Sequence, residues 1–388
     1  MSEPIQFTVV VPTRERADVL LHCLQTVVSQ TYEQVSILVS DNFSQDNTRA
    51  VVESFADSRI RYINTGKRLS MAENWEFALG HVTAGWVTIL GDDDGLLPDS
   101  LARAASIVQT SGTQAIRSSV CAYQWPSLTG ETFGHIVVPM TRRITIRDSR
   151  KWLQKAIEAR ASYLDLPMLY NGGFVDVAVL KSIEAKTGQI YRSCSPDVYT
   201  AIAIASVVDS YVYSEIPLAI NGASRHSTGA SQFSGKNRSS ESPAARFLTE
   251  QNMPFHPDLP LLADGHYPAS FQLLVYESWL QSASLRDAPD AALHARQLEL
   301  ILATAGRYRT EMEHWGQRFA AAHSLDFSAI RSKAKRTKLL RRPQSMLRKV
   351  TKKFGIHEAG SSAVPIEDVY AASLYAAKVL SSNISKGV

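Results

Sequence analysis

The sequence predicts an α/β fold: a mostly parallel sheet flanked by helices, followed by a helical extension at the C-terminal end. Two observations support this prediction. Short β-branched runs alternate with segments of helical periodicity over the first hundred residues, and such alternation is typical of βαβ units. The chain has 388 residues, of which 45% are hydrophobic and 20% charged. This composition suits a protein with a sizeable core and excludes a disordered or fibrous chain.

The first half of the chain predicts strands and helices in strict alternation. The expected strands are 7–11, 35–39, 59–63 and 86–90, and the expected helices are 20–28, 46–55 and 70–79. Pro12 is expected to end the first strand, because proline lacks a backbone N–H group. Ser44 or Asp46 is expected to cap the second helix.

The second half shows a less regular pattern. Short strands are expected at 136–138 and 144–146, a tight turn at 171–174, and helices at 152–161, 197–207, 270–282 and 291–321. Ser195 is expected as the N-cap of the helix that contains Asp197. The stretch 222–243 is rich in Ser, Gly and Asn, and this composition predicts a mobile loop.

The charge is unevenly distributed along the chain. Residues 331–353 hold eleven Lys and Arg and no acidic residue, which leaves 30 basic against 37 acidic residues elsewhere, a net charge of −7. The apolar residues between Met346 and Phe354 fall near one helical face. This pattern is typical of an amphipathic helix on an anionic membrane. The alternatives are a nucleic-acid partner, for which no aromatic platform accompanies the charge, and a solvated basic face.

Three observations predict a reducing cytoplasmic location. The three cysteines are widely spaced and none forms a CxxC pair, so neither a disulfide framework nor a cysteine-based zinc site is expected. No stretch approaches the roughly 20 uninterrupted apolar residues that span a bilayer. The first residues also lack the basic flank and apolar run of a signal peptide.

Acidic residues follow two of the expected strands. Asp92, Asp93 and Asp94 come directly after the fourth strand, and Asp41 follows the second. In parallel sheets, ligands bind beyond the carboxyl ends of the strands. Three adjacent carboxylates repel one another, and Mg2+ would compensate them while it also binds phosphate oxygens and water. The alternative is a solvated turn, because Asp and Gly are common turn residues.

These residues and their neighbours resemble glycosyltransferase family 2. The resemblance rests on Thr8 to Arg14, Leu38 to Thr48, Asn74, Gly85 and Leu90 to Pro98. The family has the Rossmann-like GT-A fold and inverts configuration at the transferred sugar. This sequence departs from it at Asn42, where a second acidic residue is common, and at Gly91, where an Asp is common. The departure at Gly91 leaves open which two of the three aspartates form the Asp-x-Asp metal pair.

The resemblance implies roles for the matching residues. Asp41 would bind the nucleobase, and residues 12–14 would form a wall of the nucleotide pocket. The implied donor-binding residues are Pro12, Thr13, Arg14, Asp41, Asn74, Asp92 and Asp93. Asp92 and Asp94, with His226, would hold Mg2+ or Mn2+ on the diphosphate, where the metal acts as a Lewis acid. The alternatives are a surface role for Arg14, a packing or capping role for Asn74 and simple exposure for His226.

The resemblance also implies a base that takes a proton from the acceptor hydroxyl. In the family this base is an Asp at a helix start, after a glycine turn that binds sugar. The turn at 171–174 resembles that turn, so Gly172 and Gly173 are expected to bind the acceptor or sugar, and Asp197 is the expected base. Asp197 could instead be a first-turn residue favoured by the helix dipole. The competing carboxylates are Asp165 and Asp176.

The expected protein is a metal-dependent, inverting hexosyltransferase that uses a nucleoside diphosphate sugar, in particular a UDP-sugar. Its acceptor would be a glycan hydroxyl in cell-surface polysaccharide or lipid-linked oligosaccharide synthesis. The alternatives are a catalytically silent sugar-binding or assembly subunit with the same fold, and a sugar nucleotidyltransferase. The nucleotidyltransferase reading is weakened by the absence of glycine from residues 12–16.

The expected organisation has a GT-A domain and a helical accessory region. The GT-A domain would cover 1–240, with a nucleotide-binding half at 1–110 and an acceptor-binding half at 111–240. The accessory region would cover 241–388, and its basic segment 331–354 would attach the enzyme to the inner face of the cytoplasmic membrane. Self-association is a further role expected of this region. No nucleic-acid partner is expected.

Overall fold

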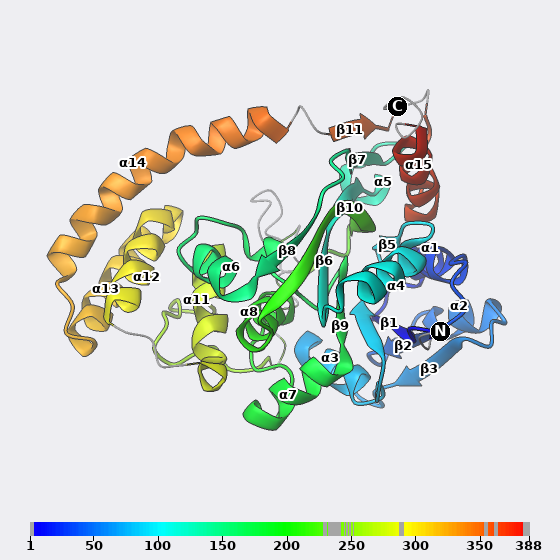
Figure 1. Ribbon diagram of the computed structural model, residues 1–388. Helices are drawn as coiled ribbons and strands as arrows, with labels where there is room; N and C mark the ends of the chain where they lie inside the picture. The colour runs from blue at the N-terminus through cyan, green and yellow to red at the C-terminus, as the bar shows by residue number, and fades with distance from the viewer. Residues whose placement is uncertain are drawn as a thin grey trace.

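The computed structural model describes residues 4–227, 231, 242, 243, 245, 247, 250, 252–286, 291–352, 356–360 and 364–382, with no side chains described from 340 to 352. Figure 1 shows a central sheet with helices on both sides and a further group of helices from the C-terminal part of the chain. The expected α/β fold is therefore confirmed. No helix in the described ranges combines the length and the apolar character needed to span a bilayer.

The first four strands form a parallel sheet in the order β4–β1–β2–β3. Their bounds are β1 (Phe7–Thr13), β2 (Val35–Asp41), β3 (Ile60–Asn64) and β4 (Trp86–Ile89). Pro12 does not end β1 as expected, because it pairs with Ser40 of β2. The carbonyl of Val10 accepts a hydrogen bond from the N–H of Leu90, directly after β4. The backbone nitrogen of Pro12 faces the same side of β1 as that of Val10, but it lies beyond the end of β4. The missing N–H group of Pro12 therefore removes no hydrogen bond between strands.

The other strands are mixed in direction: β10 (Ser210–Ala223) pairs parallel with β6 (Ala115–Gln124), and the remaining pairs of these described strands are antiparallel. β9 (Gly173–Asp176) pairs antiparallel with β4 and with β6 and joins the two halves. β10 also runs antiparallel to β5 (Gly95–Leu96) and β8 (Ile144–Asp148). β7 (His135–Pro139) pairs antiparallel with β6. Antiparallel neighbours need only short connections, unlike parallel ones.

Alternate residues of the parallel strands pack on opposite faces of the sheet. Val9 and Val11 pack with α1 (Ala17–Val28) and α4 (Ser100–Ser111). Val10 packs with α3 (Met71–Leu79), α7 (Val177–Thr187) and α8 (Pro196–Val207). Sequence alternation along β1 thus places one helical layer on each face.

The local signals at helix starts succeed in part. Ser70 caps α3 through reciprocal hydrogen bonds with Glu73, which is a capping box. The helix expected at 46–55 is α2 (Thr48–Ser54); its N-cap is Asn47, and neither Ser44 nor Asp46 takes that position. Ser195 stands at the N-cap of α8, but its side chain forms no capping hydrogen bond. The expected loop at 222–243 begins within β10 and otherwise lies largely outside the described residues.

Helices from the C-terminal part pack on one another, and the first of them packs on α8 and donates a hydrogen bond from Gln272 to the carbonyl of Ile157, at the end of α6 (Ser149–Ile157). They are α11 (Phe271–Gln281), α12 (Ala291–Thr304), α13 (Arg309–Ala322) and α14 (Phe327–Lys352). The helix expected at 291–321 is two helices, α12 and α13, separated by a 3-10 turn at Gly306–Tyr308. The other short elements are α5 (Pro126–Thr129) and the 3-10 turns Tyr163–Asp165 and Ala283–Leu285.

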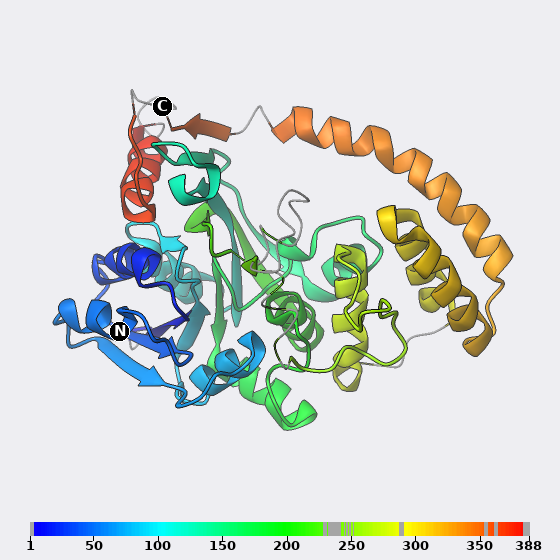
Figure 2. The same cartoon turned by 180° about the vertical axis from the view of Figure 1, so that it is seen from behind.

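The last two elements return to the sheet. Figures 1 and 2 show α14 running from the helical group towards the far edge of the sheet. There β11 (Ile356–Ala359) pairs antiparallel with β7, and α15 (Val369–Ser382) packs on α1 and β5. Val369 and Ala372 of α15 are buried in one core with Val19 of α1. The chain beyond α14 therefore supports the strand β5 that directly follows the acidic residues.

Candidate active site

The acidic turn Asp92–Asp94 lies after β4, at the carboxyl edge of the parallel strands. Two side chains contact the Asp92 carboxylate: Thr13 Oγ1 donates a hydrogen bond at 2.8 Å, and Arg16 Nη1 lies 2.9 Å from Oδ1. Burial alone would lower the pKa of Arg16, but Asp92 and Asp93 raise it above its ordinary value. The Asp92 charge is thus already balanced by a guanidinium.

Asp94 is fully buried and accepts three hydrogen bonds. They come from the Tyr170 hydroxyl at 2.7 Å, the Gly91 N–H at 3.1 Å and the Gly222 N–H at 2.7 Å. Burial, and then the charge of Asp93, raise the pKa of Asp94 well above its ordinary value. All three partners are donors, so they favour the ionised carboxylate in this position. Asp94 joins the acidic turn to β10 and to the segment before β9.

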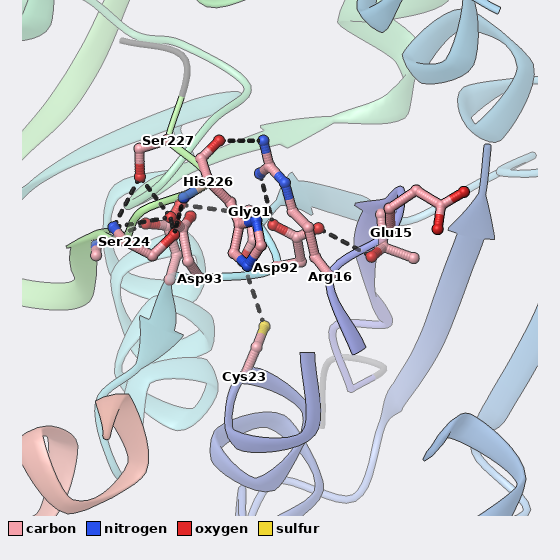
Figure 3. Close-up of polar contacts among 12 residues, drawn as sticks. Glu15, Arg16, Cys23, Gly91, Asp92, Asp93, Ser224, His226 and Ser227 are labelled. Carbon is pink, nitrogen blue, oxygen red and sulfur yellow. Dashed lines mark hydrogen bonds and ion pairs between the residues drawn. The ribbon is translucent and has the colours of Figure 1, made fainter. Parts of the chain in front are cut away.

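Asp93 is the residue of the turn whose carboxylate has an oxygen left for a ligand. Its Oδ2 accepts hydrogen bonds from the hydroxyls of Ser224 at 2.7 Å and Ser227 at 2.5 Å, as Figure 3 shows. Among the described residues, none donates a hydrogen bond to Oδ1. The indole Nε1–H of Trp125 donates to the Asp93 backbone carbonyl at 2.9 Å. These contacts fix the backbone and one carboxylate oxygen of Asp93 and leave the other available.

Two cavities adjoin the acidic turn. Cavity A has a volume of about 180 Å³, and cavity B has a volume of about 540 Å³. They share six lining residues, Arg16, Met71, Trp75, Asp93, Tyr170 and Phe247. Trp75 and Tyr170 stack with their ring centroids 5.4 Å apart. A ligand that occupies both cavities would therefore pass Asp93 and Arg16.

Cavity A contains most of the expected donor-binding residues. Its lining includes Pro12, Thr13, Arg14, Asn74, Asp92 and Asp93. Arg14 is paired with Glu250, which lines the same cavity. Asp41 does not line it: Tyr62, Asn64 and the N–H of Ser44 all donate hydrogen bonds to its carboxylate.

Cavity B contains Asp197, in the first turn of α8. The Tyr163 hydroxyl lies 3.3 Å from Asp197 Oδ2 and donates a hydrogen bond to it. Burial raises the pKa of Asp197, against smaller opposing effects that include Tyr163 and the Arg117 charge. A carboxylate with a raised pKa on a cavity wall suits a general base.

Not every expected or competing site residue takes the expected place. Asp94 lines neither cavity. His226 lines cavity A, but its Nε2 lies 3.1 Å from Asp18 Oδ2, and its contacts with the acidic turn are indirect, through Arg16 and Ser224. Asp165 and Asp176 cap the Tyr163–Asp165 turn and α7, respectively, and line neither cavity.

The turn expected to bind sugar is present, but its two glycines serve packing. A Cβ atom at Gly172 would lie 2.7 Å from Ser118 Oγ, and one at Gly173 would lie 1.8 Å from the Met168 carbonyl oxygen. Neither glycine lines a cavity, whereas the preceding Tyr170 and Asn171 both line cavity B.

A divalent cation fits at Asp93 better than elsewhere in the turn. Within the described residues, no three His, Cys, Asp or Glu side chains form a ready-made metal cluster. Mg2+ requires only one or two carboxylates when phosphate and water oxygens complete its shell. Asp93 offers Oδ1 beside both cavities. Asp94 does not fit, because both of its carboxylate oxygens already accept hydrogen bonds.

Sequence reasoning missed four residues of the site: Arg16, Trp75, Tyr170 and Arg117. Arg16 stands in the loop after β1, where position alone could have identified it. Trp75 follows Asn74 in α3. Tyr170 and Arg117 carried no sequence signal, because their roles depend on contacts with Asp94 and with the backbone of residues 164–171.

Comparisons with known proteins agree with this architecture. Residues 8–158 match the model of the family described as glycosyl transferase family 2. The GalNAc(5)-diNAcBac-PP-undecaprenol beta-1,3-glucosyltransferase of Campylobacter jejuni is 32% identical over 99 residues, which are 25% of this chain and 32% of that protein. The UDP-Glc:alpha-D-GlcNAc-diphosphoundecaprenol beta-1,3-glucosyltransferase WfgD of Escherichia coli is 27% identical over 101 residues, 26% of this chain and 40% of that protein. The chain thus spans a third to two fifths of the length of these curated relatives.

The fold is also found in a solved structure. TarS 1–349 of S. aureus, in complex with UDP-GlcNAc, superposes with a TM-score of 0.54 and 12% identity, over 86% of this chain and 89% of that chain. At this identity the similarity concerns the fold alone.

Proposed function

Because the chain belongs to glycosyltransferase family 2 and has the GT-A fold, we propose that it transfers a sugar from a nucleoside diphosphate to a glycan hydroxyl with inversion. The observation that supports this most is the pair of adjacent cavities, which share lining residues. Asp93 and Arg16 line both, and Asp197 lines the larger one. This arrangement suits a donor in cavity A, its diphosphate beside Asp93 and Arg16, and an acceptor hydroxyl in cavity B.

The proposed reaction is a single displacement. The acceptor oxygen forms a bond to the anomeric carbon as the bond from that carbon to the diphosphate oxygen breaks. Asp197 takes the proton of the acceptor hydroxyl, and the nucleoside diphosphate leaves with the bonding electron pair. Arg16, which is paired with Asp92, lines both cavities, and in this proposal its guanidinium would face the leaving group and favour its departure. A divalent cation held by Asp93 would supply Lewis-acid stabilisation of the same charge.

Uridine is the proposed nucleotide, and a surface or lipid-linked glycan is the proposed acceptor. The name of WfgD includes UDP-Glc and a sugar linked to diphosphoundecaprenol. The name of the Campylobacter jejuni relative includes a glycan linked to undecaprenol. The TarS structure contains UDP-GlcNAc. Cavity B is mainly lined by apolar groups such as Leu164, Met168 and Leu274, which suits the apolar face of a sugar ring.

A donor screen tests the proposal. We expect release of a nucleoside diphosphate from one member of a panel of UDP-, GDP- and dTDP-sugars, and a loss of that release in excess chelator. A sugar nucleotidyltransferase would instead release pyrophosphate from a nucleoside triphosphate and a sugar phosphate. A silent subunit would release neither product, and either result would contradict the proposed reaction.

We also propose that the basic segment 331–354 attaches the protein to anionic lipid. Its first part is described: Lys333, Lys335 and Lys338 of α14 are exposed, and so is 65% of the apolar side chain of Leu339. Side chains from residue 340 onward lie outside the described part. Each Lys or Arg near an anionic surface contributes about 1 kcal/mol, and salt screens this attraction.

Vesicle binding by the full chain tests this attachment. Truncation is unsuitable, because β11 and α15 pack on the sheet. We expect Lys333→Glu, Lys335→Glu and Lys338→Glu together to weaken binding to phosphatidylglycerol vesicles about tenfold or more, and rising salt to weaken the wild type. The matched control reverses three exposed charges elsewhere, Arg103, Lys151 and Lys186. Equal weakening by both triple variants, or equal binding to neutral vesicles, would contradict attachment through this segment.

A further inference from the structure

The segment 190–195 leads directly into α8, whose first turn carries Asp197. At the start of this segment, two backbone N–H groups donate hydrogen bonds to the carboxylate of Glu76 in α3. At its end, Cys194 and Ser195 line cavity B together with Asp197. The backbone that precedes Asp197 is thus itself part of the cavity wall.

Ser193 joins the end of this segment to the C-terminal part of the chain. It is buried, and its hydroxyl donates a hydrogen bond of 2.6 Å to Oε2 of Glu277 in α11. Its oxygen accepts a second hydrogen bond, of 3.1 Å, from the N–H of Ser195. Ser195 is the N-cap residue of α8, two residues before Asp197. Two consecutive hydrogen bonds therefore connect Glu277 to the start of the helix that carries Asp197.

Glu277 is an acidic residue in a fully buried position. Besides Ser193, the side-chain amide of Gln281 donates a hydrogen bond to its carboxylate, to Oε1 at 2.9 Å. Burial raises the pKa of Glu277 to about 7, against the smaller opposing effect of its hydrogen bonds. Burying a carboxylate costs free energy, and apolar residues such as Val275 already pack α11 on α8. The packing of the two helices therefore does not require a carboxylate at this position.

The carboxylate directs the hydroxyl of Ser193. An ionised carboxylate only accepts hydrogen bonds, so the single hydrogen of Ser193 Oγ points at Glu277. The lone pairs of Ser193 Oγ are then left for the N–H of Ser195. N–H groups at a helix start have no intrahelical acceptor, and the Ser195 side chain forms no capping hydrogen bond. The contact with Ser193 thus takes over part of the role of a cap for α8.

We propose that Glu277 is a positioning residue, which acts through Ser193 to fix the start of α8 and to hold Asp197 in line with the acceptor hydroxyl. This inference rests on the proposed function, because it takes Asp197 to be the base. A displacement of about 1 Å at a reacting group can cost about 100-fold in rate, and Ser195 lies only two residues from Asp197. The helix α11 of the C-terminal part thus takes part in catalysis, beyond the lipid attachment and self-association expected of that part.

The experiment separates the positioning of Asp197 from the stability of the fold. Glu277→Met removes the acceptor at a similar side-chain size, Ser193→Ala breaks the same link without altering α11, and Glu277→Gln keeps an oxygen for Ser193. The matched control is Gln297→Leu, which removes buried hydrogen bonds from α12 to Gln272 and to the Ile157 carbonyl, outside both cavities.

The measured quantities are kcat and donor KM for nucleoside diphosphate release, together with the free energy of unfolding in urea. The donor is the UDP-, GDP- or dTDP-sugar that the wild type selects in the donor screen, with water as the acceptor at pH 8, above the pKa of Glu277. We expect Glu277→Met and Ser193→Ala to lower kcat about tenfold and to leave donor KM unchanged, and Glu277→Gln to keep most of the rate. Gln297→Leu should lower only the free energy of unfolding.

The decisive variant combines Glu277→Met with Asp197→Asn. If Glu277 acts through Asp197, its substitution should lower kcat no further once the base is absent. A further tenfold loss in this background, or an unchanged kcat in folded Glu277→Met and Ser193→Ala, would overturn the inference. Normal turnover of Asp197→Asn, or no release from any sugar nucleotide by the wild type, would instead overturn the proposed function, and this inference with it.

Discussion

The acidic turn and Asp197 both border cavity B, but their carboxylates are held in different ways. Asp92 and Asp94 accept hydrogen bonds from side chains or backbone groups on both oxygens. Within the described part of the chain, Asp197 has one side-chain partner, Tyr163, at 3.3 Å. Donors on both oxygens hold the Asp94 carboxylate in place and favour its ionised form, although burial and the charge of Asp93 still raise its pKa well above the ordinary value. Burial also raises the pKa of Asp197. Unlike Asp94, Asp197 lines cavity B, where a base can take a proton from a ligand. The role of each carboxylate, structural or catalytic, can thus be inferred from its hydrogen-bond partners and its surroundings.

The largest effect that this comparison predicts is at Asp197. Asp197→Asn keeps the shape of the side chain and an oxygen for Tyr163, but it cannot accept a proton at neutral pH. Turnover at saturating donor should fall about 100-fold or more, while donor affinity changes little. The measurement is nucleoside diphosphate release together with the donor Kd.

Asp165→Asn is the matched control for this variant, because Asp165 lines neither cavity. It should retain nearly the wild-type rate. If Asp197→Asn turned over normally but bound donor poorly, Asp197 would be a binding residue, and the distinction between the two acidic sites would disappear.

The second prediction concerns Asp93. Asp93→Asn keeps an oxygen for the hydroxyls of Ser224 and Ser227, so the free energy of unfolding should change little. Loss of an outer partner of a metal ligand already costs about 10–100-fold in metal affinity, so loss of a ligand should cost at least as much. We expect donor affinity in Mn2+ to fall at least tenfold, to the level of the wild type in excess chelator. A variant whose donor affinity still responded to Mn2+ like the wild type would place the metal elsewhere.

The third prediction concerns the neighbouring Asp94. All its partners are hydrogen-bond donors, so the amide of Asp94→Asn would direct its own N–H groups at one of them. The free energy of unfolding should fall by about 1–3 kcal/mol, measured by urea denaturation of both Asn variants. Equal stability of the Asp93 and Asp94 variants would contradict the separation of a ligand-binding role from a structural one.

The sequence predicted where the acidic residues stand but not which of them is accessible. The strand-helix alternation places the acidic turn after β4, and a helix-start pattern places Asp197 in the first turn of α8. Both signals are local. The partners that occupy Asp94 include Tyr170 and Gly222, which are 76 and 128 residues away along the chain. No local pattern encodes such contacts. The sequence alone therefore could not show whether Asp92 and Asp94 form the expected metal pair.

The C-terminal part illustrates the same limit. Helical periodicity predicted α11 to α13, apart from the break before Arg309. It did not predict that β11 would join the edge of the sheet or that α15 would cover α1. Trp125 is another case: its ring lies in a core, but its indole N–H bonds the Asp93 carbonyl. Composition identifies a buried residue, whereas its partner depends on tertiary packing.

The smallest predicted effect tests the proton affinity of Asp197 directly. Asp197 must be ionised to accept a proton, so the rate should rise with pH through its raised pKa and be lost below it. The Tyr163 hydroxyl donates to the ionised form, so Tyr163→Phe should raise the pKa of Asp197 further. The acid limb of the pH-rate profile should then move to higher pH, with the plateau rate nearly unchanged. Tyr211→Phe is the matched control, because the Tyr211 hydroxyl bonds the Asp165 carbonyl instead. A limb that moved equally in both variants, or to lower pH in Tyr163→Phe, would show that Asp197 does not set the profile.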